Sequence, residues 1–220
     1  MLATDRRRGP TYERKLALSR RALIMAAPYL MLPAVARALA PTPDATEGPF
    51  YPVEIPKDND SDLVRVEGAV REAGGDILHL AGAALDTNGR PLAGARVEIW
   101  QCDVNGVYLH PYDRRIGRRD QGFLGFGHLI ADAEGRFRFR TIVPVPYPGR
   151  TPHIHVKVLR DRREALTSQL YRAGYPQNAS DFLFRRMSPA EQDRVSMVLT
   201  PTTETRGPSF RTEVTLVVGG

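Results

Sequence analysis

The residues Asp132-Ala133-Glu134-Gly135-Arg136-Phe137-Arg138-Phe139-Arg140 of this 220-residue chain read as a turn followed by a strand. Side chains alternate across an extended strand, so Phe137 and Phe139 share one face and the three arginines share the other. This alternation predicts a half-buried strand with one face on a core and the other in solvent. The turn places an Asp where its side chain can bond the backbone and a Gly where positive φ is needed.

The same kind of turn occurs at Asp86-Thr87-Asn88-Gly89 and at Asp103-Val104-Asn105-Gly106. We therefore interpret these aspartates as turn formers and not as catalytic carboxylates. From residue 63 onward the sequence consists of short strand patterns broken by turns, without a long helical periodicity. This predicts an all-β fold, an antiparallel β-sandwich that forms a single domain over residues 41–220.

Other stretches fit this architecture. Val97 and Ile99 alternate as in a strand, and residues 212–218 are expected to form the last strand. The one late helix is expected at Ser188-Pro189-Ala190-Glu191, with Ser as N-cap, Pro in the first turn and Glu placed for a capping box. Residues 41–62, rich in Pro, Asp and Asn, are expected to form an irregular arm over the sandwich.

The charge of the chain is unevenly distributed. The formal net charge is +6, and residues 1–40 contain eight basic and two acidic side chains, which accounts for all of it. The remaining 23 basic and 23 acidic side chains balance, so the body has no net field to attract nucleic acid. The single cysteine, Cys102, excludes an internal disulfide and a site built on several thiolates, and it is interpreted as a small buried side chain.

Residues 1–40 resemble a signal segment. A basic start leads to Ser19-Arg20-Arg21, and an apolar run over residues 22–35 follows. The adjacent arginines indicate twin-arginine export, so the protein is expected to be periplasmic or secreted. Cleavage after Ala40 would leave Pro41 at the new terminus, which signal peptidases process poorly, so we expect cleavage after Ala38.

A membrane anchor is the alternative for the same segment. Fourteen apolar residues are fewer than the roughly 20 needed to span hydrocarbon, and Pro28 and Pro33 interrupt them. We therefore expect no stable membrane span after processing, with an uncleaved anchor as the remaining option.

A pair of histidines provides the first chemical signal. In Thr151-Pro152-His153-Ile154-His155-Val156-Lys157-Val158, the two histidines lie two residues apart and share one face of a strand. Ile154, Val156 and Val158 occupy the other, apolar face, which is the core side. The histidines thus face away from the hydrophobic layer, as a chelating pair would, although an H-x-H motif alone is common to zinc enzymes, cupins and non-metal proteins.

The usual partners of such a pair are missing from the sequence. No additional Cys or H-E-x-x-H motif occurs nearby, and the upstream acids belong to turns, so tyrosines remain as candidate ligands. Tyr147 is restrained by Pro146 and Pro148, and Tyr108 follows the turn that ends at Gly106. Spacing alone favours two ordinary amphipathic tyrosines.

These two stretches together resemble the intradiol ring-cleavage dioxygenases, the family of catechol 1,2-dioxygenase and protocatechuate 3,4-dioxygenase. Its signature is a Tyr after a W-x-x-D-x-x-G turn, then Y-x-x-R-x-x-H-x-H. The matching positions are Trp100, Asp103, Gly106, Tyr108, Tyr147, Arg150, His153 and His155, and the similarity extends over roughly residues 45–175. The interval from Tyr147 to His153 is shorter than in the best-known members, so pocket shape and substrate do not carry over.

The resemblance implies Fe(III) bound by two Tyr and two His, with Tyr108 and His153 equatorial and Tyr147 and His155 axial. It implies that a catechol-type ring is cleaved with O2 between its two hydroxyls to a cis,cis-muconate-type diacid. Tyr147 would be the ligand that leaves and accepts a substrate proton. The identity of the catechol, and whether the protein is a monomer or a homo-oligomer, are left open.

Other roles also follow from the resemblance. Arg150 would stabilise negative charge on the substrate, and Gln169 would support the site. The substrate pocket would be bordered by Gly48, Pro49, Phe50 and Tyr51. His110 lies outside the motif and is interpreted as structural, although it would share a face with Tyr108 if a strand continued there.

Two other classes of function compete with this one. Residues 89–97 also resemble transthyretin-like modules, which are non-catalytic β-sandwiches. A 2-His Fe(II) or Zn(II) enzyme would use only His153 and His155. Hard phenolate ligands favour trivalent iron, because two phenolates and one hydroxide neutralise its charge and leave no uncompensated charge buried.

Replacement of Arg20 and Arg21 by Lys tests the export signal. We expect the variant to accumulate in the cytoplasm while wild-type protein is exported, because twin-arginine recognition requires the arginine pair. Cell fractionation followed by immunoblotting measures this, and equal export of the variant would show that another signal is used.

Overall fold

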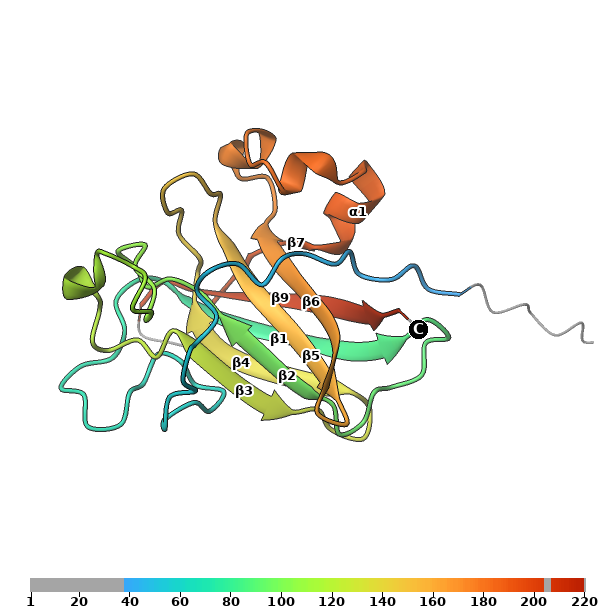
Figure 1. Ribbon diagram of the computed structural model, residues 1–220, viewed down its shortest axis with the longest axis horizontal. Helices are drawn as coiled ribbons and strands as arrows, with labels where there is room; N and C mark the ends of the chain where they lie inside the picture. Colours follow the sequence, from blue (N-terminus) through green and yellow to red (C-terminus); the bar gives the residue numbers. More distant parts are fainter. Residues whose placement is uncertain (1–37, 204–206, 220) are drawn as a thin grey trace, which may run out of the picture. The chain divides into compact units, whose positions relative to one another are not determined.

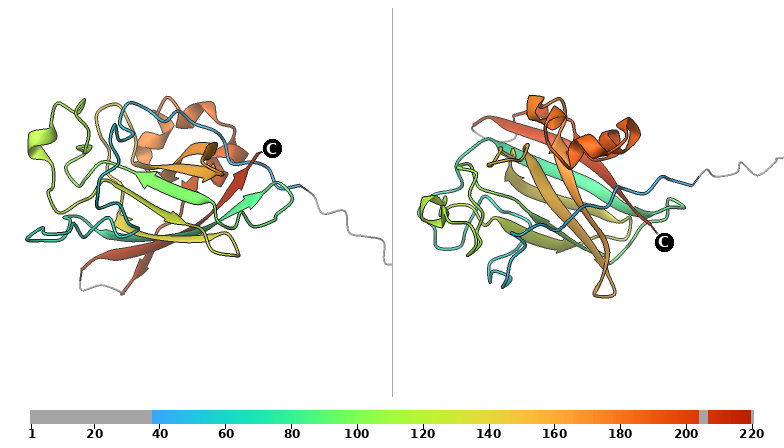
Figure 2. Two further views of the ribbon diagram at one scale, coloured as in Figure 1. Left: turned by 60° about the horizontal axis from the view of Figure 1, so that its bottom comes forward. Right: turned by 45° about the horizontal axis from the view of Figure 1, so that its top comes forward.

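The computed structural model describes residues 38–203 and 207–219, and this part of the chain contains a β-sandwich. Most of the segment expected to direct export, residues 1–37, lies outside the described residues. Two sheets stack as layers (Figures 1 and 2). The first has the strand order β4-β1-β9-β8 and the second β3-β2-β5-β6-β7.

The strands of the first sheet are β1 (Ile77–Asp86), β4 (Arg136–Ile142), β8 (Thr200–Thr202) and β9 (Ser209–Val218). Those of the second are β2 (Arg96–Trp100), β3 (Phe126–Ile130), β5 (His153–Arg160), β6 (Arg163–Arg172) and β7 (Ser196–Met197). Three 3-10 helices, Ile116–Arg118, Pro176–Ala179 and Phe184–Arg186, and the α-helix α1 (Pro189–Arg194) complete the described elements.

The main core lies between the two sheets. Phe137 and Phe139 of β4 are buried in it while Arg136 and Arg138 are exposed, which confirms the predicted half-buried strand. Residues from both sheets contribute, among them Leu78, Leu80, Val97, Ile99, Ile154, Val156, Val158 and Leu216. Full burial of each large apolar side chain contributes about 1.5–3 kcal/mol to folding.

The prediction of a wholly antiparallel sandwich is wrong in two places. β9 runs parallel to β1 along ten residue pairs, from Ile77 with Ser209 to Asp86 with Val218, and β7 pairs in parallel with β6. The alternation of side chains, on which the prediction depended, is the same in both strand directions. The last strand also starts at Ser209, three residues before the expected position.

The turns and the helix form as predicted. In all three turns an aspartate oxygen accepts backbone N–H groups: Asp86 from Asn88 and Arg90, Asp103 from Asn105 and Val107, and Asp132 from Glu134 and Arg136. Ser188 caps α1 in a capping box with Glu191. Within the described residues, no helix has the length and apolar character needed to cross a membrane.

The segment over residues 41–62 is irregular and crosses the outer face of β5 and β6, as expected (Figure 1, blue). Its backbone is joined to the sandwich by hydrogen bonds from Thr42 N to Val217 O and from Ala45 N to Thr167 O. The Ser168 hydroxyl donates to Pro43 O at 2.7 Å. The arm is therefore a third layer over part of the second sheet.

Replacement of Asp103 by Ala should destabilise the protein by about 3 kcal/mol, because three backbone N–H groups lose their acceptor in a buried place. The carboxylate is buried and accepts from Asn105, Val107 and Asp120. Urea unfolding measures the loss. The matched control is Asp132→Ala in the exposed turn, where water can replace the carboxylate, and equal losses in the two variants would contradict this account.

Candidate metal centre

Both faces of β5 are buried, but in different surroundings. Ile154, Val156 and Val158 point into the main core, whereas His153 and His155 point to the opposite side and are only 1% and 2% exposed. There they meet a second cluster, here called the aromatic cluster, which consists of Trp100, Cys102, Tyr108 and Phe126 with Phe50, Tyr51, Val145 and Tyr147 packed against it. The histidines thus face away from the main core without facing solvent.

The two imidazoles converge through their ε nitrogens. His153 Nε2 and His155 Nε2 lie 3.2 Å apart. His153 Nδ1 lies 2.7 Å from the Thr151 carbonyl oxygen, which can only accept, so Nδ1 carries the proton and Nε2 has a free lone pair. This is the arrangement in which a histidine binds a metal ion through Nε2.

The structure brings Tyr108 and Tyr147 to the same two histidines. The ring centroids of Tyr108 and Tyr147 are 5.3 Å apart and almost perpendicular. Tyr147 lies 5.5 Å from His153, and Tyr108 lies 6.2 Å from His155. Four side chains from β5 and two loops thus form one group of rings.

Local contacts fix the two tyrosine loops. The backbone N–H of Tyr108 donates to Asp113 at 2.9 Å, and Asp113 is in turn paired with Arg115. Gly106 has a φ of +71°, and a Cβ there would come within 3.0 Å of the Pro146 carbonyl oxygen, so glycine lets the two loops touch.

Residues 101–125 form no strand, so His110 does not share a strand face with Tyr108. The His110 ring instead packs at an angle against the ring of Phe50.

One unpaired polar atom of the site matches a metal ion. The Tyr108 hydroxyl is buried without a hydrogen-bond partner of normal geometry, although Tyr108 is close enough to Tyr147 for each phenol to affect the pKa of the other. Unpaired buried oxygen and nitrogen atoms are costly unless something binds them. In the described part of the chain no three His, Cys, Asp or Glu side chains gather to hold a metal, so a metal here would need the phenol oxygens.

Burial sets the protonation of these groups. It lowers the pKa of His153 to about 3, with a further contribution from the Arg150 charge, and holds the pKa of His155 well below its usual range. Both imidazoles are therefore neutral at pH 7. Burial raises the pKa of Tyr108 and of Tyr147, and the Arg150 charge opposes the rise in both. Ionised phenols in this place require a nearby positive charge.

Arg150 sits at the edge of the ring group and is held by several partners. Its Nε donates to Asp181 at 2.8 Å, and its Nη2 donates to Gln169 at 2.6 Å. Nη1 reaches the Tyr147 hydroxyl at 3.4 Å and Nη2 the Tyr171 hydroxyl at 3.5 Å. Burial would lower the pKa of Arg150, but the hydrogen bond to Asp181 together with the charge interactions with Tyr147, Asp181 and Tyr171 raises it above its usual range, so the guanidinium stays charged.

Sequence reasoning missed two members of this network. Tyr171 faces His153 across the β5–β6 pairing, and its hydroxyl donates to Gln169 at 2.9 Å. Its position two residues after Gln169 could have indicated a shared face. Asp181, which also accepts the Thr151 N–H, lies in an irregular segment and gave no signal.

The segment expected to border the substrate pocket lies directly on the rings. Phe50 stacks on Tyr108 with centroids 4.5 Å apart, and the α-carbon of Gly48 lies against His155, where an added Cβ would be 3.5 Å from Cε1. The Tyr51 hydroxyl donates to Glu98 at 2.7 Å. Pro49 is exposed.

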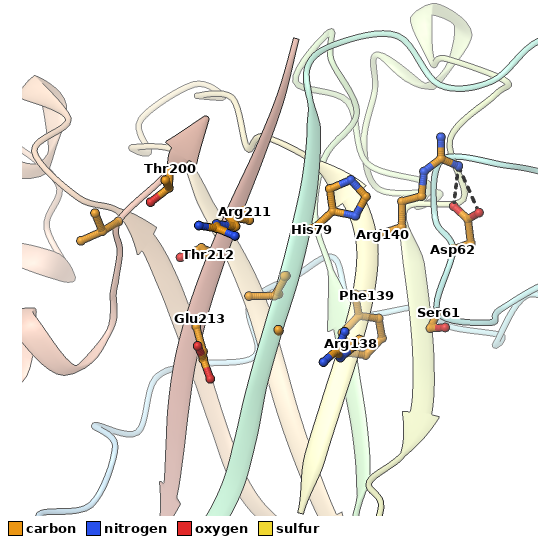
Figure 3. Close-up of a pocket in the computed structure, with 13 residues that line it drawn as sticks. Ser61, Asp62, His79, Arg138, Phe139, Arg140, Thr200, Arg211, Thr212 and Glu213 are labelled. Carbon is orange, nitrogen blue, oxygen red and sulfur yellow. Dashed lines mark hydrogen bonds and ion pairs between the residues drawn. The ribbon is translucent and has the colours of Figure 1, made fainter. Parts of the chain in front are cut away.

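Two surface hollows differ in their relation to this site. A hollow of about 570 Å³ is lined by Tyr147, Arg150 and Asp181, so it borders one ring of the group. A larger one of about 850 Å³ lies on the outer face of the first sheet, between Arg138, Arg211 and Glu213 (Figure 3). None of the residues that line the larger hollow belongs to the aromatic cluster, so this hollow does not border the candidate metal centre.

Comparisons with known proteins agree with the resemblance seen in the motifs. Residues 46–217 match the family model described as Dioxygenase. The chain is 33% identical over 180 residues to the protocatechuate 3,4-dioxygenase beta chain of Burkholderia cepacia, with 78% of this chain and 77% of the relative covered. It is 34% identical over 158 residues to hydroxyquinol 1,2-dioxygenase of Rhodococcus opacus, with 61% and 48% covered, so it spans about half the length of that relative.

Among solved structures, the chain is similar to the dioxygenase domain of a dioxygenase carbohydrate-binding protein fusion from Streptomyces sp. SirexAA-E. The two share 33% sequence identity with a TM-score of 0.63, and the match covers 82% of this chain and 99% of the other.

The neutral state of His153 predicts a pH dependence of the metal-free protein. The unfolded chain protonates this histidine below about pH 6.5, while the folded protein keeps it neutral down to about 3. The unfolded state therefore binds more protons between these values, and stability falls as the pH drops. The His153→Gln variant lacks this titrating group, so wild type should lose stability relative to it as the pH falls. The difference between their free energies of unfolding, wild type minus variant, should decrease by about 1.4 kcal/mol per pH unit below pH 6.5. Urea titrations from pH 7 to 5 measure this, and parallel pH profiles would contradict it.

Proposed function

Since this chain belongs to the intradiol ring-cleavage dioxygenase family, we propose that it holds one ferric ion on Tyr108, Tyr147, His153 and His155 and opens a catechol-type ring with O2 between its two hydroxyls. The product would be a cis,cis-muconate-type diacid. The observation that carries this proposal is the meeting of the two Nε2 atoms, 3.2 Å apart, with two phenol rings packed against the same imidazoles.

The donor set suits a trivalent ion. Phenolate oxygens are hard ligands, and those of Tyr108 and Tyr147 would supply two of the three negative charges required. Because both histidines are neutral, hydroxide would supply the third, and no net charge would be buried. When bound, ferric iron would chelate the catechol oxygens and make the ring reactive toward O2.

The two tyrosines differ in a way that suits different roles. Tyr108 is 2% exposed, is stacked under Phe50 and has its backbone fixed by Asp113. Tyr147 is only half-buried and lines the hollow that opens to solvent. We therefore assign Tyr108 as the permanent ligand, and Tyr147 as the one whose oxygen is displaced and takes a proton from a catechol hydroxyl.

Arg150 is placed to stabilise negative charge on the substrate. Its guanidinium reaches the Tyr147 hydroxyl, and a substrate oxygen that replaces this phenol would meet the same charge. Gln169 is fully buried and acts through Arg150: its Oε1 accepts from Arg150 while its Nε2 donates to Thr46 O of the arm. Gln169 is thus a positioning residue, and residues 48–51 border the substrate space.

The test starts with the full chain purified with iron. We expect a strong visible charge-transfer band from tyrosinate on Fe(III), uptake of O2 with a member of a catechol, protocatechuate and hydroxyquinol panel, and a product opened between the two hydroxyls. Tyr147→Phe should change the band, and Tyr108→Phe should weaken iron retention by about 10-fold or more.

The matched control is Tyr171→Phe, which removes a nearby phenol that is not a proposed ligand. It should keep the band. A colourless iron- or zinc-bound protein would favour the site that uses only His153 and His155, and native colour in a Tyr108→Phe, Tyr147→Phe double variant would exclude the tyrosine assignment.

A further inference from the structure

The two histidines of the proposed site are held in different ways. His153 Nδ1 donates to the Thr151 carbonyl oxygen, and such a bond fixes the tautomer and the ring plane of a metal-binding histidine. His155 has no equivalent bond, because its Nδ1 is buried without a hydrogen-bond partner. The one hydrogen bond that the His155 ring makes within the described residues joins its Nε2 to His153 Nε2, where the proposed metal would bind, so a different contact is needed to fix the ring plane when metal is present.

That contact is a stack on Trp100. The indole and the imidazole lie 4.7 Å apart between centroids, with only 11° between their planes. Trp100 and His155 are direct partners in the β2–β5 pairing, so the two backbones place the rings face to face. The close backbone of Gly48 limits the ring on another side.

The Trp100 side chain is held by contacts to its ring and not by a hydrogen bond. It is 1% exposed, and its indole Nε1 is buried without a hydrogen-bond partner. Tyr51 meets it edge-on at 5.0 Å, and the Lys157 ammonium lies 4.0 Å from the centre of the Tyr51 ring. The same ammonium lies 5.9 Å from the centre of the Trp100 ring, so Trp100 is packed between His155 on one face and these two side chains.

We propose that Trp100 is a positioning residue of the metal centre, whose indole face fixes the plane of His155 so that the Nε2 atoms of His155 and His153 point to one place. The inference rests on the proposed function, because it takes His155 as a ligand. Without the stack the imidazole can turn about its χ2 bond, which is a broad and soft torsion, and Nε2 then leaves the shared position.

The test compares Trp100→Leu, which keeps an apolar side chain but removes the stacking face, with Trp100→Phe, which keeps a ring. Full-length proteins are titrated with ferric iron against a competing chelator, the visible spectrum is recorded, and metal-free thermal unfolding is measured. Trp100→Leu should lose about 10–100-fold in iron affinity, the range typical of lost supporting contacts to a ligand. Trp100→Phe should recover most of that loss.

The matched control is Phe126→Leu, because Phe126 flanks Trp100 on the opposite side, is equally buried and does not stack on His155. It should lower the unfolding temperature to a similar extent yet keep iron affinity and colour. Equal affinity losses in the two Leu variants, or native affinity in Trp100→Leu, would overturn the positioning role. If Trp100→Leu does not fold, Trp100→Met replaces it, since Met fills the space without a flat face. Wild-type protein that binds no ferric iron would instead overturn the proposed function.

Discussion

The outer face of β5 carries His153 and His155 and has to be kept dry, and three irregular segments of the described chain meet that requirement. On the surface of an uncovered sandwich the two imidazoles would face water, which would weaken their interaction with any charge between them. The arm and the two tyrosine loops close this face, so that His153 and His155 become as buried as the core residues that alternate with them. The site is therefore a small second core, built from aromatic rings with polar atoms directed inward.

Polar contacts add to the ring packing that attaches the arm, because an irregular segment has no ladder of strand hydrogen bonds. Lys157 is 5% exposed and forms ion pairs with Glu47 of the arm and with Glu164. Glu98 is buried beside it, bonded to Tyr51 of the arm and to Arg96. Each buried charge thus has an opposite charge or a donor, which avoids the large cost of an isolated buried ion. The same contacts determine where Phe50 and Gly48 touch the rings.

The parts that sequence could predict are those governed by local periodicity. The alternation in residues 153–158 correctly separated the histidine face from the core face, and the aspartate turns and the capping box of α1 depend on contacts within a few residues. The parallel pairing of β1 with β9 and the contact of Asp181 with Arg150 join residues far apart in the chain, and no local pattern records them. The tyrosines needed the family resemblance, because spacing alone did not distinguish them from ordinary tyrosines.

The charges around the rings fall into two separately balanced groups. Arg150 and Asp181 form one neutral pair, with side chains that are 9% and 0% exposed. The proposed ferric ion, its two phenolates and hydroxide form the other, and the neutral histidines add nothing to either. Because Asp181 already balances Arg150, the guanidinium does not oppose a cation in the resting site with a full unpaired charge. Its Nη1 still points toward the Tyr147 oxygen at 3.4 Å, so Arg150 can stabilise negative charge that appears there only during the reaction, which is what transition-state stabilisation requires.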